Sequence, residues 1–180
     1  MPALRSDAAR SRARILDAAR DLPPDELRLN DLARDTGLGV GTVYRHFPTV
    51  TALLEALHFD SLTALVDAAR AAVDAPSAGS AFVDLVREVA ELQISRDGLQ
   101  AVLIAPDPSP EVGALREEFA RLAALGLDAA IREGRIRPGM TVDQIQRLIC
   151  GVEHAVRLGD GRDRQLLLDV TLAGLAPVRD

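Results

Sequence analysis

The sequence predicts an all-α protein of about nine helices, and three observations support this fold class. Apolar residues recur every three or four positions along most of the chain, which is the spacing of one helix face. The β-branched residues are scattered, and no stretch alternates apolar and polar residues as a strand does. With 180 residues, 48% of them hydrophobic, the chain can bury one real core or two small ones.

Prolines, a glycine and a threonine delimit the first four helices. Pro23 and Pro24 stop the first helix. Gly37 suits the left-handed turn between the second and the third, and Thr49 is the expected N-cap of a long fourth helix. We therefore expect helices over residues 7–22, 29–35, 40–46 and about 50–73.

The rest of the chain is divided by a polar break over residues 74–80 and a proline-rich loop over 106–110. Thr141 and Gln144 have the spacing of a capping box at the start of another helix. We expect helices over residues 81–95, 112–133, 142–158 and about 162–175, with a short apolar segment at 99–104.

The residues present exclude several kinds of site. Cys150 is the only cysteine, so an intrachain disulfide and a multi-cysteine zinc site cannot form. His58 and His154 are isolated, and no acidic residue is paired with a nucleophile, so we expect no metal, no cofactor and no enzymatic activity. No apolar run approaches the roughly 18 residues of a membrane span, and the first residues lack the apolar core of a signal peptide. We therefore expect a cytoplasmic protein with no membrane partner.

The second and third predicted helices have the form of a helix-turn-helix unit. Ile15 and Ala19 of the first helix are expected to receive the apolar side chains of this unit, namely Leu32, Ala33, Leu38 and Val43. The outer face of the third helix then carries Val40, Gly41, Thr42, Tyr44, Arg45 and His46. A major groove accepts such a face, because short side chains allow close approach and longer polar ones reach phosphates.

Residues 10–57 resemble the DNA-binding domain of the tetracycline-repressor (TetR-like) family of transcriptional regulators. The most diagnostic segment is residues 37–47, which read Gly-Leu-Gly-Val-Gly-Thr-Val-Tyr-Arg-His-Phe. The resemblance implies a DNA-binding domain over residues 1–48 and a regulatory, ligand-binding and dimerisation domain over 49–180. It also implies a bacterial homodimer that binds a palindromic double-stranded DNA operator and leaves it when a small molecule binds.

The resemblance assigns contacts on the third helix residue by residue. Phosphate contacts are implied for Tyr44 and His46, although the alternative is that both are ordinary helix surface. Contacts with bases or phosphates are implied for Val40, Gly41, Thr42 and Arg45.

Five further positions flank this helix. Arg28 stands where many members open the second helix with a threonine, and it can still reach a phosphate. Thr49 and the helix start behind it can meet another phosphate. Val50 replaces the lysine that most members have there, which removes one charged contact. Arg10 and Arg14 are either DNA contacts or part of a solvated charge run.

The net charge of −6 taken over the whole chain argues against nucleic-acid binding. The charge is not evenly distributed, however. Residues 1–58 carry eight arginines and eight acidic residues, whereas residues 59–180 carry 13 arginines and 19 acidic residues. The first 20 residues hold five arginines against Asp7 and Asp17. We therefore expect a positive N-terminal arm beside the helix-turn-helix.

A ligand pocket is expected among the fourth to seventh helices, although each candidate residue has a competing interpretation as plain core. With one tyrosine and no tryptophan in the chain, an apolar or weakly polar ligand is expected. The candidates are Phe59, Leu62, Val66, Phe82, Leu85, Val89, Gln93, Leu103 and Phe119.

The last two helices carry apolar residues around more than one face, so a partner copy must cover the side that the protomer leaves open. Cys150 is interpreted as a packing residue rather than a redox sensor, because it has no basic neighbours. We predict a four-helix dimer interface with Cys150, Gly151, His154, Leu167, Val170, Thr171 and Gly174.

Together these features predict a homodimeric DNA-binding transcriptional regulator, in its specific form a repressor released by a small apolar or weakly polar ligand. The alternative is a helical dimer that binds a small molecule or a protein and has lost specific DNA binding. Val50 and the neutral charge of residues 1–58 suggest this alternative.

Overall fold

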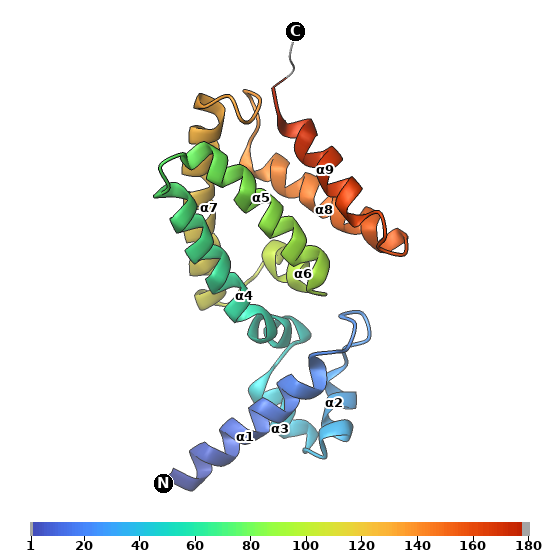
Figure 1. The fold of residues 1–180 in the computed structure, drawn as a ribbon. Helices are drawn as coiled ribbons and strands as arrows, with labels where there is room; N and C mark the ends of the chain where they lie inside the picture. Colours follow the sequence, from blue (N-terminus) through green and yellow to red (C-terminus); the bar gives the residue numbers. More distant parts are fainter. Residues whose placement is uncertain (1, 178–180) are drawn as a thin grey trace. The chain divides into compact units, whose positions relative to one another are not determined.

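The computed structural model describes residues 2–177, with side chains from residue 7 onward. In that part of the chain it has nine helices and no strand, which confirms the predicted all-α fold class (Figure 1). The helices are α1 (Pro2–Ala19), α2 (Leu29–Thr36), α3 (Val40–His46), α4 (Val50–Val73), α5 (Ala78–Ser95), α6 (Leu99–Ile104), α7 (Pro110–Arg132), α8 (Val142–Leu158) and α9 (Arg164–Leu175).

Most predicted helix bounds agree with the structure, and those of α3, α4 and α8 agree at both ends. The short apolar segment expected at residues 99–104 is the helix α6. α5 begins inside the break expected over residues 74–80, because a carboxylate from the turn just after α7 caps its first turn. Glu133 accepts hydrogen bonds from the Gly79 N–H at 3.0 Å and from the Ser77 hydroxyl at 2.9 Å. The first helix ends at Ala19, before the expected end at Leu22, whose side chain is exposed.

The caps expected from the sequence are confirmed. The Thr49 hydroxyl accepts a hydrogen bond from the Ala52 N–H at 3.0 Å. Thr141 and Gln144 form the reciprocal capping box, with distances of 3.2 and 2.9 Å. Gly37 ends α2 with φ 63° in the left-handed region, where a side chain is strained.

Contacts divide the described chain into two compact units. The first holds residues up to 60 together with 97–110, and the second holds residues 61–96 together with 111 onward. The N-terminal part of α4 and the whole of α6 thus pack with the helix-turn-helix. This division differs from the boundary expected after residue 48, which stays a sequence-based prediction.

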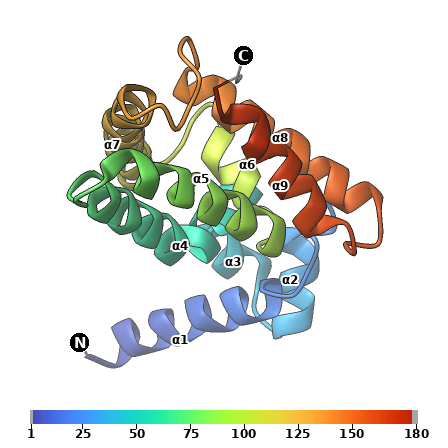
Figure 2. The ribbon, with the colours of Figure 1, turned by 45° about the horizontal axis from the view of Figure 1, so that its top comes forward.

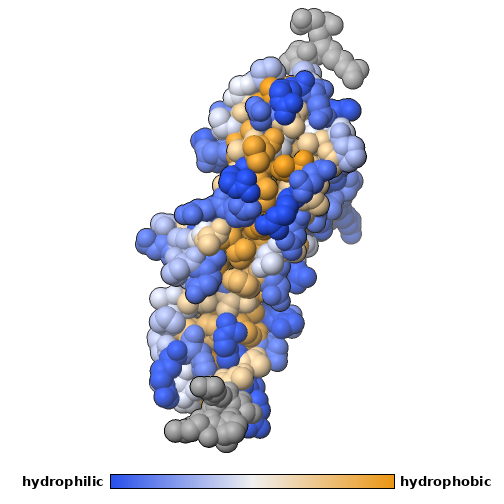
Figure 3. Space-filling view, turned by 90° about the vertical axis from the view of Figure 1, so that its left-hand side faces the viewer, coloured by the Kyte–Doolittle hydropathy of each residue, from blue (hydrophilic) through white to orange (hydrophobic). Residues whose placement is uncertain are grey.

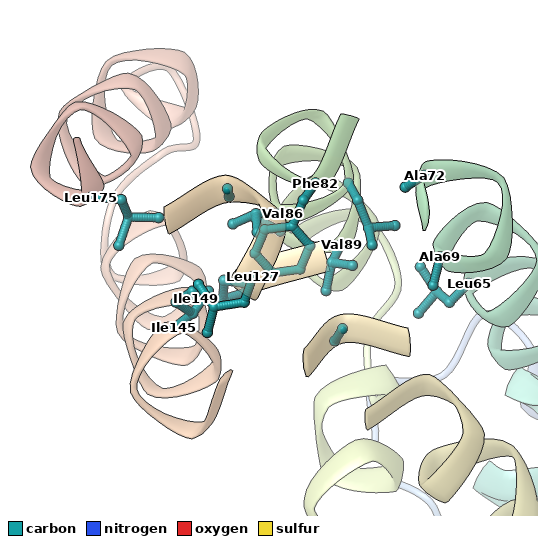
Figure 4. Close-up of a cluster of buried hydrophobic side chains, with 14 of the residues drawn as sticks. Leu65, Ala69, Ala72, Phe82, Val86, Val89, Leu127, Ile145, Ile149 and Leu175 are labelled. Atoms are coloured by element: carbon teal, nitrogen blue, oxygen red, sulfur yellow. The ribbon is translucent and has the colours of Figure 1, made fainter. Parts of the chain in front are cut away.

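Side chains from α4, α5, α7, α8 and α9 build the core of the second unit (Figure 4). Figure 4 shows Phe82 of α5 beside Leu127 of α7, with Leu65 from α4 and Ile149 from α8 in the same cluster. Burying a side chain of this size contributes about 1.5–3 kcal/mol, so this cluster holds the five helices together. Figure 2 shows α8 and α9 side by side, as their contacts require.

The exposed surface is mixed in character. On the face that Figure 3 shows, hydrophilic residues predominate and hydrophobic residues are exposed between them. No single helix in the described residues is long and apolar enough to cross a membrane, and α3 and α4 meet that test only together, across a bend of 54°.

Candidate nucleic-acid interface and effector-binding region

Two buried side chains fix which side of α3 faces outward. Val43 is 0% exposed and Phe47 is 2% exposed, and both belong to the inner face of the helix-turn-helix. Ile15 of α1 is also fully buried, as the sequence predicted for the helix that supports this unit. The guanidinium of Arg12 lies over the Phe47 ring, 5.1 Å from its centroid, and closes this small core on one side.

The opposite side of α3 forms a continuous accessible surface. Val40 is 49% exposed and Tyr44 is 44% exposed. A Cβ placed on Gly41 would meet no atom within 4 Å, so no described residue packs against this position of the helix. Arg45 is exposed, while Thr42 and His46 are half-buried. This surface has the short-then-long order of side chains that close approach to a groove requires.

Arg14 and Arg28 are held by carbonyl groups of the protein itself. Arg14 donates to the Thr36 carbonyl, which ties α1 to the end of α2. The Arg28 guanidinium donates to the carbonyls of Asp25 at 2.8 Å and Leu27 at 2.9 Å. Arg14 therefore holds the end of α2 and Arg28 holds the loop before α2, roles that the sequence did not reveal.

Arg45 and Arg10 are more accessible. Arg45 donates to the Gly41 carbonyl at 3.0 Å, so it lies along the outer face of its own helix. Arg10 forms an ion pair with Asp7, and because both side chains are mostly exposed this pair adds little stability. Arg5, the first arginine of the N-terminal arm, has a side chain outside the described residues.

The start of α4 is exposed and has the helix-end geometry that suits an anion. Thr49 is exposed and caps the helix, and the first N–H groups of a helix point outward from its end. Val50 is half-buried at the first helical position. This position therefore has helix geometry but carries no charge.

Two buried polar side chains of α4 fasten the segment that contains α6. The carboxylate of Glu55, 6% exposed, accepts a hydrogen bond from the Ser109 N–H at 2.9 Å. The Nε2 atom of His58, 7% exposed, lies 3.0 Å from the carbonyl oxygen of Asp97. The two contacts hold residues 97–110 at both ends within the first unit. The sequence signal was two polar residues three positions apart among the apolar positions of α4.

The nine candidates for a ligand pocket are divided between the two units. Phe59, which is 40% exposed, and Leu103 belong to the first. In the second unit Phe119 is half-buried and six are buried, namely Leu62, Val66, Phe82, Leu85, Val89 and Gln93. Val66, Phe82, Leu85 and Val89 are members of the core cluster and Phe119 packs against it, which accords with their competing interpretation as core.

Gln93 departs from that interpretation. Its side chain is 0% exposed, and its Oε1 and Nε2 atoms have no hydrogen-bond partner among the described residues. Leaving a buried polar group unpaired costs about 1–3 kcal/mol.

The α8 and α9 helices leave an apolar face open. Ile145 and Ile149 are buried, whereas Leu148 of the same helix is 44% exposed. On α9, Leu166 and Val170 are each 62% exposed. The residues predicted for the dimer interface are all exposed or half-buried in the protomer, namely Cys150, Gly151, His154, Leu167, Val170, Thr171 and Gly174.

Solved structures similar to this chain are transcription regulators. The TetR transcription regulatory protein from Mycobacterium vanbaalenii is 31% identical, and the match covers 97% of this chain and 99% of that one with a TM-score of 0.51. The chain belongs to the TetR family of transcriptional regulators. A TetR transcriptional regulator from Streptomyces coelicolor is 28% identical over 93% of this chain and 99% of its own, with a TM-score of 0.54.

The TetR-family fold also appears in a more distant structure. The regulator FadR from Bacillus subtilis, in complex with stearoyl-CoA, has a TM-score of 0.64 over 93% of this chain and 99% of its own at 16% identity. That similarity concerns the fold alone. Protein-family models and curated proteins give no match.

Membership of the TetR family makes the chain a DNA-binding transcriptional regulator with a ligand-binding domain. Within the described residues of this TetR-family protein, no group of three or more His, Cys, Asp or Glu side chains could hold a metal ion. The Cys150 thiol lies 3.6 Å from Nε2 of Gln146, its neighbour one turn away on α8.

Proposed function

We propose that this TetR-family protein is a homodimeric repressor, and that a small apolar or weakly polar effector releases it from a palindromic operator. The accessible outer face of α3, held in place by buried Val43 and Phe47, carries the proposal. Phosphate contacts are assigned to Tyr44 and His46, and base or phosphate contacts to Val40, Gly41, Thr42 and Arg45. Further contacts are assigned to Arg10, Arg14, Arg28 and Thr49.

The open face of α8 and α9 supports the homodimer. Large apolar side chains that are 44–62% exposed lose contact with water when a second copy packs on them. Gly151 and Gly174 add support, because a Cβ on either would meet nothing within 4 Å in the protomer. Two-fold symmetry would then pair two helix-turn-helix units with two half-sites of a palindrome.

The continuity of α4 supports the coupling between effector and DNA. One helix, Val50–Val73, begins beside the proposed phosphate contact and continues into the second unit. An effector that favours a different tilt of α4 would change the separation of the two α3 helices. Affinity then falls, because half-site spacing must match that separation.

The proteins that this chain resembles are transcription regulators, and the proposal assigns it no catalytic step. DNA binding is tested with a Tyr44→Phe/His46→Ala double variant and a labelled duplex taken from the DNA upstream of its own gene. We expect affinity to fall about 10- to 30-fold, since each lost hydrogen bond is worth about 1 kcal/mol. Fluorescence anisotropy between about 50 and 200 mM salt gives both the affinity and the salt slope.

Arg132→Ala is the matched control, because it removes a positive charge from an exposed position in the second unit. Its affinity should equal that of the wild type. Unchanged affinity and salt slope in the double variant would show that α3 is the wrong face. Negligible, salt-independent binding by the wild type would favour the alternative, a helical dimer that binds ligands without DNA.

A further inference from the structure

Gln93 carries a buried primary amide that the packing of the second unit does not satisfy. An amide of this kind offers two donors and one acceptor. Protein interiors pair nearly all such groups, yet neither polar atom of Gln93 has a partner in the described part of the chain. Other glutamines behave as expected: Gln144 caps α8 and Gln165 donates to Asp169 at 3.2 Å.

The position of Gln93 on α5 excludes a surface role. Phe82, Val86, Val89 and Gln93 follow one another at intervals of three or four residues, and all four are buried. They therefore occupy one stripe of the helix, the stripe that faces the core. A glutamine at the end of an otherwise apolar stripe presents its amide to an apolar environment.

The charges around this stripe narrow the chemistry of any molecule that binds there. In the second unit the described buried polar side chains are Gln93 and Glu153, and the latter is paired with Arg157 at 3.0 Å. Neither of these two buried side chains is a cation that could balance the charge of a carboxylate ligand. An ionised group would lose its hydration without compensation.

We propose that Gln93 is the specificity-determining contact for the effector, and that the effector is a neutral, largely apolar molecule with a lactam, primary amide or un-ionised carboxyl group. Such a group holds a donor beside an acceptor. It can therefore donate to Oε1 and accept from Nε2 in one paired arrangement. A lactone or ketone only accepts, and it leaves Oε1 unsatisfied. The inference rests on the proposed effector binding.

The first test needs no ligand. Gln93→Met keeps the length of the side chain and removes its polar atoms, so it replaces an unpaired amide with an apolar group. We expect the variant to have a higher Tm than the ligand-free wild type, and Gln93→Leu to act in the same direction. Exposed Gln165→Met is the control and should not raise the Tm. A lower Tm in both Gln93 variants would overturn the inference, because it would mean that a buried water already satisfies the amide.

The second test uses carbostyril and coumarin, which share one bicyclic skeleton and differ by a ring N–H in place of a ring oxygen. We expect calorimetry to show that the wild type binds the lactam carbostyril about 10- to 100-fold more tightly than the lactone. In Gln93→Met this preference should disappear. Equal affinities in the wild type, an unchanged preference in the variant, or no binding of carbostyril would each overturn the inference.

Both measurements are made without DNA. If the operator-binding test fails, these two measurements still decide whether Gln93 contacts the effector. Conversely, a wild type that binds DNA but shows no preference for the lactam retains its proposed function and loses the Gln93 contact.

Discussion

The ring of Phe82 on α5 packs directly against Gly126 of α7, so closely that a Cβ on Gly126 would lie 2.5 Å from Cδ2 of the ring. This contact brings two helices of the second unit together at the centre of its core. Gly126→Ala should therefore lower the free energy of unfolding by about 1–3 kcal/mol, the usual cost of overpacking. Denaturant titration measures the loss.

Gly41→Ala is the matched control, because it also places an alanine in a helix but meets no atom within 4 Å. It should leave stability unchanged or raise it by up to about 1 kcal/mol through helix propensity. Equal effects of the two substitutions would mean that Phe82 does not fill the space at Gly126.

The second prediction restores the charge at the start of α4. Val50→Lys should tighten operator binding and raise the salt slope by about one, because a lysine at a helix start adds one phosphate contact. Ala71→Lys adds the same charge at an exposed position in the second unit. If both variants tighten binding equally, the gain comes from net charge alone and the start of α4 does not touch DNA.

Sequence periodicity predicted most of this fold because the signals for it are local. Thr49 caps the residues that follow it, and the Gly37 turn requires only its own backbone conformation. The bounds of α3 and α8 accordingly agree with the structure. The start of α5 was missed because its cap, Glu133, lies 54 residues away along the chain.

The sequence predicted which helix faces form the candidate site, but not the contacts that its side chains make. The predicted packing of Val43 against the first helix showed which side of α3 is buried, and so which side is open. The sequence could not show that Arg14 donates to the Thr36 carbonyl, because that contact joins two helices. The missing partner of Gln93 was equally invisible, since hydrogen bonding in a core depends on every neighbour at once.

The third prediction concerns the pH dependence of the Glu133 cap. Hydrogen bonds from the Gly79 N–H and then from the Ser77 hydroxyl lower the pKa of Glu133 below its ordinary value. A carboxylate with a lowered pKa in the folded state stabilises the protein above the ordinary glutamate pKa of about 4.3. That contribution is lost as the pH falls through the lower folded-state pKa.

Glu133→Gln should thus lower the Tm by a few degrees at pH 7, and its difference from the wild type should shrink below about pH 4. Thermal denaturation followed by circular dichroism across this range measures both. Glu117→Gln, an exposed change within α7, the helix that precedes Glu133, serves as the control and should show no such pattern. A constant difference at every pH would mean that the charge of Glu133 contributes nothing to the cap.

The last prediction tests the face of α8 and α9 as an interface between two copies. Val170 is 62% exposed on α9, so a glutamate there costs the protomer little. In a symmetric dimer each copy would bury that charge against its partner, and an unpaired buried charge is strongly destabilising. Val170→Glu should weaken dimerisation at least about 100-fold, which corresponds to the roughly 3–5 kcal/mol cost of such a charge. Sedimentation equilibrium measures the change.

Leu158→Glu is the control, because it makes the same kind of change outside the predicted interface. The Leu158 side chain is 77% exposed, more than that of Val170. The control variant should remain dimeric, and both variants should keep the wild-type helix content. Because operator binding needs two helix-turn-helix units, Val170→Glu should also lose affinity for a palindromic duplex while Leu158→Glu keeps it. A dimer that survives Val170→Glu would place the interface on another surface, since no arrangement that buries this face can hold two unpaired carboxylates without a large loss of affinity.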